Sequence, residues 1–175
     1  MWKLVARIVA TPVVSKWIIA RAMRTPYQHI MSADGNDMYM GRWWLLNPYS
    51  RETHKPKHKW FPWSIRVHHI MRPDSDRDLH DHPWNARTII LRGGYTEERP
   101  AIRQGSASLL SVTRRVQIIR RPGDTASLNF GEYHRIDYVP PEGAFTLFIT
   151  SKWRGDWGFM VGGRKVIWRK YLNLD

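Results

Sequence analysis

The chain contains no cysteine. Disulfide bonds, thiolate metal ligands and a cysteine nucleophile are therefore excluded. Acidic residues are also scarce, with 15 Asp and Glu against 28 Lys and Arg, which gives a formal net charge of +13. A surface of this charge attracts polyanions and small anions, although no nucleic-acid-binding motif accompanies it. We therefore expect a small anionic substrate, and we keep a nucleotide or a nucleic acid as a second hypothesis for the partner.

Long uncharged apolar runs are missing as well, and none approaches the length of a membrane span. Near the N-terminus, Arg7 and Lys16 interrupt the apolar residues, which disfavours a secretory signal. Together with the absence of cysteine, this leads us to expect a cytoplasmic protein. The chain of 175 residues fits one domain and is long enough to bury a core without disulfides.

The first part of the chain, residues 2–23, is apolar with basic residues at near-helical spacing. Pro12 should break or kink this segment, because proline cannot continue a helix from within. We expect residues 1–35 to form a helical segment that packs on a domain formed by residues 36–175. We favour this packing over the two alternatives, a basic amphipathic contact with a membrane surface and a contact with another protein.

From about residue 37 the sequence consists of short runs typical of β-strands, separated by turns such as Gly93-Gly94, Pro122-Gly123 and Gly162-Gly163. No long helical pattern interrupts them, which argues against a parallel α/β fold and indicates an all-β sandwich or barrel. The expected strands are Met38–Leu46, Ile65–Met71, Arg87–Leu91, Ser108–Val112, Val116–Arg120, Thr125–Leu128, Arg135–Tyr138, Phe145–Thr150, Trp157–Val161 and Lys165–Arg169.

Two segments carry candidate chemistry. His80-Asp81-His82 precedes an apolar run, and in an extended chain residues i and i+2 project to the same face, so the two imidazoles can bind one ion. The second segment runs from Gly123 through Gly131 to His134, with a glycine opening a strand, a glycine turning the chain and a histidine following. Asp81, between the paired histidines, should point away from the ion.

Taken together, these segments resemble the two motifs of the cupin superfamily. His80, His82 and Gly94 match the first motif, and Gly123, Gly131 and His134 match the second. Asp74 stands where the first motif opens with glycine, Asn129 where the second has proline, and Tyr138 where it has asparagine. The stretches around His80 and Gly93 also resemble cupin-like proteins of bacteria and their phages. The resemblance implies a double-stranded β-helix, the jelly-roll barrel of that superfamily, here with the N-terminal helical segment.

The resemblance further implies a metal site formed by His80, His82 and His134. The glutamate ligand of the family falls at Arg87, and arginine stays protonated and cannot bind a cation. Three-histidine cupins include the thiol dioxygenases, which use Fe(II), so Fe(II) is the expected metal, with Zn, Ni, Mn and Cu as alternatives. If Arg87 points inward, it would bind a substrate carboxylate or phosphate through its guanidinium. The alternative is that Arg87 faces outward from its strand. Tyr95 and Tyr133 are further candidates for the active site or, equally, for core packing.

The function that we expect from these residues is that of a mononuclear Fe(II) oxygenase, a metal-dependent oxidoreductase. Two alternatives stay open: an isomerase or epimerase of sugar nucleotides with a histidine such as His134 as general base, and a non-enzymatic cupin that binds a ligand or a nucleic acid. A homodimer formed through sheet edges is a further hypothesis.

Overall fold

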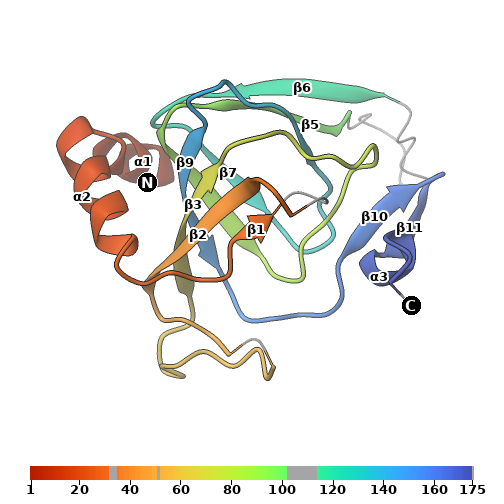
Figure 1. The fold of residues 1–175 in the computed structure, drawn as a ribbon, viewed down its shortest axis with the longest axis horizontal. Coiled ribbons are helices and arrows are strands. Elements are labelled where there is room, and N and C mark those ends of the chain that lie inside the picture. The colour runs from red at the N-terminus through yellow and green to blue at the C-terminus, as the bar shows by residue number, and fades with distance from the viewer. Residues whose placement is uncertain (32–34, 51, 102–113, 175) are drawn as a thin grey trace.

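The computed structural model describes residues 1–31, 35–50, 52–101 and 114–174, and within these ranges β-strands predominate (Figure 1). The helices are α1 (Trp2–Val9), α2 (Pro12–Ala22) and the short α3 (Trp168–Tyr171). The strands are β1 (Ile30–Met31), β2 (Met38–Leu46), β3 (Ser64–Ile70), β4 (Ala86–Arg92), β5 (Tyr95–Pro100), β6 (Arg115–Arg120), β7 (Thr125–Leu128), β8 (Arg135–Tyr138), β9 (Ala144–Thr150), β10 (Gly158–Val161) and β11 (Arg164–Ile167).

A six-stranded sheet with the order β1-β2-β3-β9-β4-β7 forms the centre of the molecule. Its inner strands β3, β4 and β9 are covered on both faces, so their sequences contain nearly continuous buried runs. Because side chains alternate between the faces of a strand, Val67, Ile89 and Leu147 point to one face, and Ile70, Ile90 and Ala144 point to the other.

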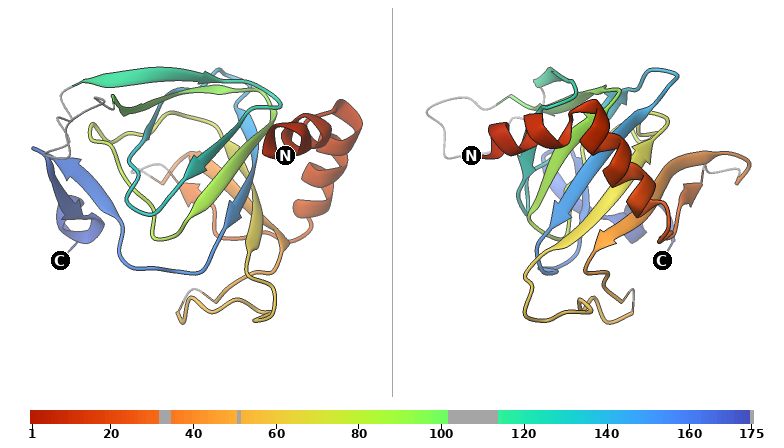
Figure 2. Two further views of the ribbon diagram at one scale, coloured as in Figure 1. Left: turned by 180° about the vertical axis from the view of Figure 1, so that it is seen from behind. Right: turned by 90° about the vertical axis from the view of Figure 1, so that its left-hand side faces the viewer.

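Helices α1 and α2 cover the first of these faces, as Figure 2 shows. Pro12 is the first residue of α2, where a missing backbone N–H costs nothing, and it separates this helix from α1 as expected. Ala6, Ile18 and Ala22 pack against the sheet in one apolar cluster with Leu91. None of the described helices has the length and apolar character needed to cross a membrane.

The opposite face of the large sheet packs on a three-stranded sheet with the order β6-β5-β8. Tyr95 of β5 and Ile136 of β8 share an apolar cluster with Ile70 and Ile90 of the large sheet. The sequence predicts a closed barrel, but among the described residues the sheets remain separate in their hydrogen bonding, with β10 and β11 forming a third. The candidate site lies between the two larger sheets.

Eight of the expected strands coincide with observed ones, within a residue or two at each end. The expected strand Ser108–Val112 lies outside the described residues. The expected strand Lys165–Arg169 is wrong at its end, because the chain turns into α3 at Trp168. Strand β5 was not expected, since its sequence Tyr-Thr-Glu-Glu-Arg-Pro is too polar to resemble a buried strand.

Candidate metal centre

Two distant segments bring the three histidines together. His80 lies in the connection between β3 and β4, and it pairs with His134, which directly precedes β8, in an isolated antiparallel bridge. The backbone N–H of each residue donates to the carbonyl of the other at 2.9 Å. The His134 ring then lies 4.9 Å from the His80 ring and 5.1 Å from the His82 ring, measured between centroids. The backbone pairing therefore fixes the separation of the imidazoles before any ion binds.

The nitrogen atoms of these rings have the spacing of a metal site. Nε2 of His82 lies 2.9 Å from Nε2 of His134. One nitrogen from each of His80, His82 and His134 lies within 4.8 Å of the others. Two nitrogens bound at right angles to one ion, each about 2.1 Å from it, would be about 3 Å apart. The arrangement thus fits a single ion held by three imidazoles.

Burial keeps the paired histidines neutral. The pKa of His80 is lowered from 6.5 to about 4, mainly by burial, which Asp74 opposes and the neighbouring His134 reinforces. The pKa of His82 is lowered well below its ordinary value by burial and by His134 and His80. Neutral imidazole is the form that binds a metal, so these residues need not lose a proton at neutral pH.

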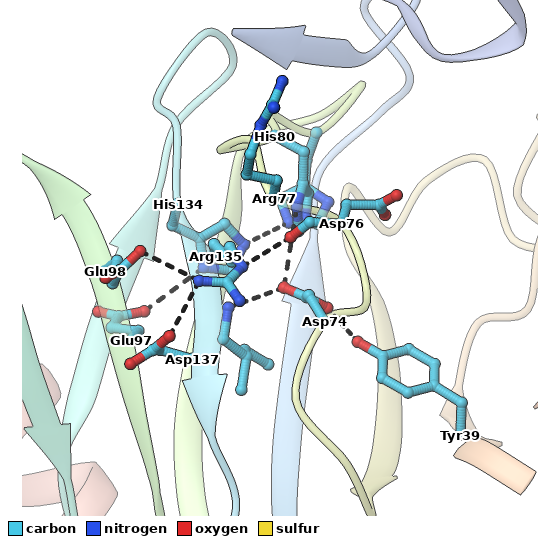
Figure 3. A network of polar contacts seen from close by, with 12 residues as sticks. Tyr39, Asp74, Asp76, Arg77, His80, Glu97, Glu98, His134, Arg135 and Asp137 are labelled. Atoms are coloured by element: carbon cyan, nitrogen blue, oxygen red, sulfur yellow. Dashed lines mark hydrogen bonds and ion pairs between the residues drawn. The ribbon is translucent and has the colours of Figure 1, made fainter. Parts of the chain in front are cut away.

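A buried carboxylate lies behind His134. Oε2 of Glu97 is 3.5 Å from Nδ1 of His134, and neither atom has another hydrogen-bond partner among the described residues (Figure 3). The other oxygen of Glu97 accepts hydrogen bonds from Arg99 at 3.0 Å and from Arg120 at 2.8 Å. Burial alone would raise the pKa of Glu97, but His134 and the two guanidiniums hold it at about 2. Glu97 is therefore ionised and placed to accept a hydrogen bond from Nδ1–H of His134. This arrangement leaves Nε2 of His134 free to bind an ion.

A second carboxylate lies beside His80. Oδ2 of Asp74 is 3.9 Å from Nδ1 of His80, and Asp74 also accepts hydrogen bonds from the Tyr39 hydroxyl and, at 2.7 Å, from the Ile136 backbone N–H (Figure 3). The residue that replaces the glycine of the cupin motif is thus a partly buried acid next to a ligand candidate. The sequence shows that Asp74 replaces this glycine, but it does not predict that the carboxylate lies beside His80.

Asp81 points away from the histidines, as the alternation of an extended chain predicts. It is fully buried, and it accepts hydrogen bonds from the Gly158 backbone N–H at 2.7 Å and from Nζ of Lys165 at 2.6 Å. Asp81 therefore ties the histidine segment to β10 and β11, which gives it a structural role.

The three residues proposed for catalysis lie in different places. Tyr95 borders the same small cavity as His80 and His134, about 60 Å³ in volume, and burial followed by Glu97 raises its pKa. Tyr133 packs in a separate cluster with two apolar residues, and burial with Asp81 raises its pKa to about 12. Both phenols therefore stay protonated at neutral pH.

The expectation that Arg87 clamps a substrate at this site does not fit its position. Its neighbour Thr88 borders the cavity, so Arg87 points to the other face of β4. There its guanidinium lies over the ring of Trp2 at 4.8 Å and donates to the Thr125 hydroxyl at 3.2 Å. The spacing of the motif could not reveal which face of β4 the helices cover.

Two inward-facing residues of β3 were missed as site residues. Arg66 is only 2% exposed, and its guanidinium lies 5.1 Å from the ring centre of Trp84 and 5.5 Å from that of Phe148. His68 borders the cavity, its Nε2 has no partner among the described residues, and burial with Arg66 lowers its pKa well below the ordinary value. The alternation Ser-Ile-Arg-Val-His could have indicated that Arg66 and His68 share a face.

The comparison with solved structures supports the cupin resemblance at the level of the fold. A cupin-2 domain protein from Rhodospirillum rubrum superposes with a TM-score of 0.51 at 11% identity, over 85% of this chain and 80% of that one. Oxalate decarboxylase from Bacillus subtilis gives 0.49 at 13% identity, over 80% of this chain and 31% of that one. Fe(II)-HppE gives 0.45 at 11% identity, over 71% and 55%.

No family model matches the sequence, and no curated protein sequence does. At such low identities a structural likeness shows the fold alone, and function must be argued from the site.

Proposed function

We propose that this chain, which has the fold of the cupins, binds one divalent metal ion through His80, His82 and His134. The observation that carries the proposal is the distance of 2.9 Å between Nε2 of His82 and Nε2 of His134. The two rings lie in a partly buried cluster in which the carboxylate of Glu97 faces His134. Two imidazole nitrogens at this distance either share one proton or bind one ion. A proton serves only two of the three rings, whereas an ion uses all three.

The carboxylates leave Nε2 of the histidines that they face available as ligand atoms. Glu97 faces Nδ1 of His134 and Asp74 faces Nδ1 of His80, so each acid favours the tautomer with its proton on Nδ1. The lone pair on Nε2 of His134 then faces His82, whose own Nε2 is 2.9 Å away. Histidine ligands in metalloproteins are oriented in this way by a hydrogen bond from the other ring nitrogen.

We propose Fe(II) as the ion and oxidation of a small anionic substrate as the reaction class. Imidazole donors suit iron, and also zinc, nickel, manganese and copper. Three protein ligands without a carboxylate leave open coordination positions and a net positive charge, which favours an anionic ligand. When bound, iron would supply the redox chemistry that no side chain of this cysteine-free chain provides.

The remaining residues of the cavity would bind small ligands of the ion and keep water away from it. The Tyr95 phenol and the unpartnered Nε2 of His68 are polar groups at its wall, while Phe148 and Ile136 exclude water. A cavity of about 60 Å³ accommodates an ion with one or two small ligands, so a larger substrate would have to enter from the edge of the two sheets. We read these two facing sheets as the halves of a jelly roll.

Whereas Arg87 points to the other face of β4, Arg66 of β3 is a buried cation close to the histidines. Its positive charge contributes to the low pKa of both His68 and His82.

The sugar-nucleotide isomerase alternative requires one histidine as general base, and three convergent imidazoles are more than that reaction needs.

The test is anaerobic titration of the untagged, metal-free protein with Fe(II), followed by dioxygen uptake in the presence of candidate carboxylate substrates. We expect one equivalent to bind and His82→Ala to lose that binding. His69→Ala is the matched control, because His69 stacks on Phe145 on the other face of β3. Binding that persists in His82→Ala would overturn the proposal. So would a wild-type protein that binds none of Fe(II), Zn(II), Ni(II), Mn(II) and Cu(II) in the same titration.

A further inference from the structure

A larger pocket, about 430 Å³ in volume, lies outside the metal centre. One wall is the long loop that follows β2, drawn below the sheets in Figure 1, and the other is the segment of residues 151–154 after β9. Pockets that bind small molecules generally range from about 300 to 1,000 Å³. The volume therefore suits a ligand far larger than the cavity beside the histidines accepts.

Asn47 holds much of the loop wall in place, together with backbone hydrogen bonds such as that from Lys57 to the Pro48 carbonyl at 2.8 Å. The side chain of Asn47 is 2% exposed, and its amide nitrogen lies 3.1 Å from the Phe61 carbonyl and 2.9 Å from the Trp63 carbonyl. Its amide oxygen accepts the backbone N–H of His58 at 2.8 Å. A buried asparagine with several hydrogen bonds fixes the loop as a rigid wall, which lowers the entropic cost of binding.

The opposite wall is tied to the segment that carries the histidines. The backbone N–H of Arg154 donates to the Pro83 carbonyl at 2.7 Å, and that of Ser151 donates to the Asn85 carbonyl at 2.8 Å. Both walls are therefore formed before a ligand arrives.

The chemistry of the lining combines flat aromatic rings with cations. Trp63 is 49% exposed and supplies an accessible indole ring, whereas the ring of Trp153 is stacked on His54 at 3.9 Å and that of Trp84 on His82. The exposed side chains of Lys59, Lys152 and Arg154 supply positive charge. Among the described residues that line the pocket there is no carboxylate.

A half-exposed tryptophan and three solvent-exposed cations thus gather at one pocket whose described lining contains no carboxylate, a combination that suits a ligand with a planar ring and a negative charge. The rings can stack on a planar aromatic group, and the cations can bind phosphate or carboxylate.

We propose that this pocket binds a nucleotide, with the base against the half-exposed indole of Trp63 and the phosphate against Lys59, Lys152 and Arg154. The nucleotide is either free or the end of a single strand, since the two present the same base and phosphate.

The pocket is separate from the metal centre, and the proposal does not depend on a bound metal. Trp84 lines the pocket, and its ring is stacked 6.2 Å from that of His82, which places one indole between the two sites. Nucleotide binding is therefore expected in the metal-free protein as well.

The experiment is isothermal titration of the full chain, metal-free, with three probes: AMP, adenosine and ribose 5-phosphate. We expect AMP to bind at least tenfold more tightly than either fragment, because only AMP offers both the ring and the phosphate. Equal affinity for AMP and ribose 5-phosphate, or no binding of AMP, would overturn the proposal.

Variants test the location. Lys152→Gln and Trp63→Leu should each weaken AMP binding roughly five- to tenfold, the latter in keeping with the worth of base stacking. Lys57→Gln and Trp60→Leu are matched controls from the same loop that do not line the pocket, and they should leave the affinity within twofold. Equal losses in the controls would contradict the assignment, and thermal unfolding of each variant verifies that it folds.

A further probe, oligo(dA) with a 5′-phosphate, separates the two sources of the nucleotide. Tighter binding than AMP with the same dependence on Trp63 and Lys152 identifies the end of a strand. Binding no tighter than AMP identifies a free nucleotide. Fe(II) titration of the same variants should be unchanged, so that a failure of this proposal and a failure of the metal site are distinguishable.

Discussion

Replacing Glu97 by glutamine tests whether the buried acid behind His134 supports the metal site. Glu97 is completely buried, ionised because its pKa is about 2, and 3.5 Å from Nδ1 of His134. Glutamine keeps the size of the side chain but removes the charge. Its amide group can also donate to Nδ1, which favours the tautomer with the proton on Nε2, the atom that would bind the ion.

We expect the dissociation constant for the metal to rise about 10- to 100-fold in Glu97→Gln, the range typical for loss of a carboxylate that orients a histidine ligand. With the same change Arg120 loses its ion pair with Glu97, and Arg99 loses one of its two ion pairs among the described residues and keeps the one with Glu132. Breaking one member of a buried ionic network costs about 3 to 5 kcal/mol, so affinity must be measured where the variant is still folded.

The assay is competition between the metal-free protein and a chelator of known affinity, with Zn(II) as a redox-inert probe. Glu98→Gln is the matched control, because this neighbouring acid pairs with Arg115 of β6 and Arg135 of β8 rather than with a histidine. An unchanged constant in Glu97→Gln, or an equal rise in Glu98→Gln, would refute the reasoning.

Three further predictions concern stability. Between pH 6.5 and about 4, the unfolded chain binds a proton at His80 that the folded chain does not. The contribution of His80 to the free energy of unfolding of the metal-free protein should therefore be complete above pH 6.5. It should fall by roughly 3 kcal/mol as the pH is lowered toward 4. Urea unfolding at several pH values checks this, and an identical pH slope in His80→Gln would contradict it. Asn47→Ala should cost about 2 kcal/mol or more in urea unfolding through lost buried hydrogen bonds. Asn173→Ala, at an exposed position with a similar positive φ of 54° against 50°, should cost clearly less, and equal losses would argue against a role for the Asn47 side chain. Lys165→Met should lower the thermal midpoint by several degrees because it leaves the carboxylate of Asp81 buried without its cation, and an unchanged midpoint would show that the pair is not stabilising.

Much of the large sheet and the convergence of the three histidines could be predicted from sequence. Strands such as Met38–Leu46 are apolar or β-branched runs between turns, and the paired histidines follow from the period of an extended chain. The meeting of His80 with His134 could be predicted only through the resemblance to the cupin motifs, because 54 positions of chain separate the two and no local pattern joins them.

The roles of charged residues were the part that sequence could not predict. Strand β5 contains Glu97 and Glu98, which are unusual in a strand and are stabilised by arginines from β6 and β8 that only the register places beside them. Arg87 and Arg66 lie on strands of similar composition but on opposite faces of the sheet. Tertiary packing decides which face of the sheet the helices cover. A shift of one residue along a strand moves a side chain from one face to the other, so the sequence alone does not tell which arginine faces the site.

The metal content of the untagged protein, purified without added metal, tests the central claim most directly. Elemental analysis of the wild type beside the His80→Ala/His134→Ala double variant should find close to one equivalent of a transition metal, which we expect to be iron, and its loss in the variant. Another metal in the same proportion would keep the site and change the reaction class. Equal metal in both proteins, or none in the wild type and no uptake of Fe(II), Zn(II), Ni(II), Mn(II) or Cu(II) on titration, would contradict the three-histidine site.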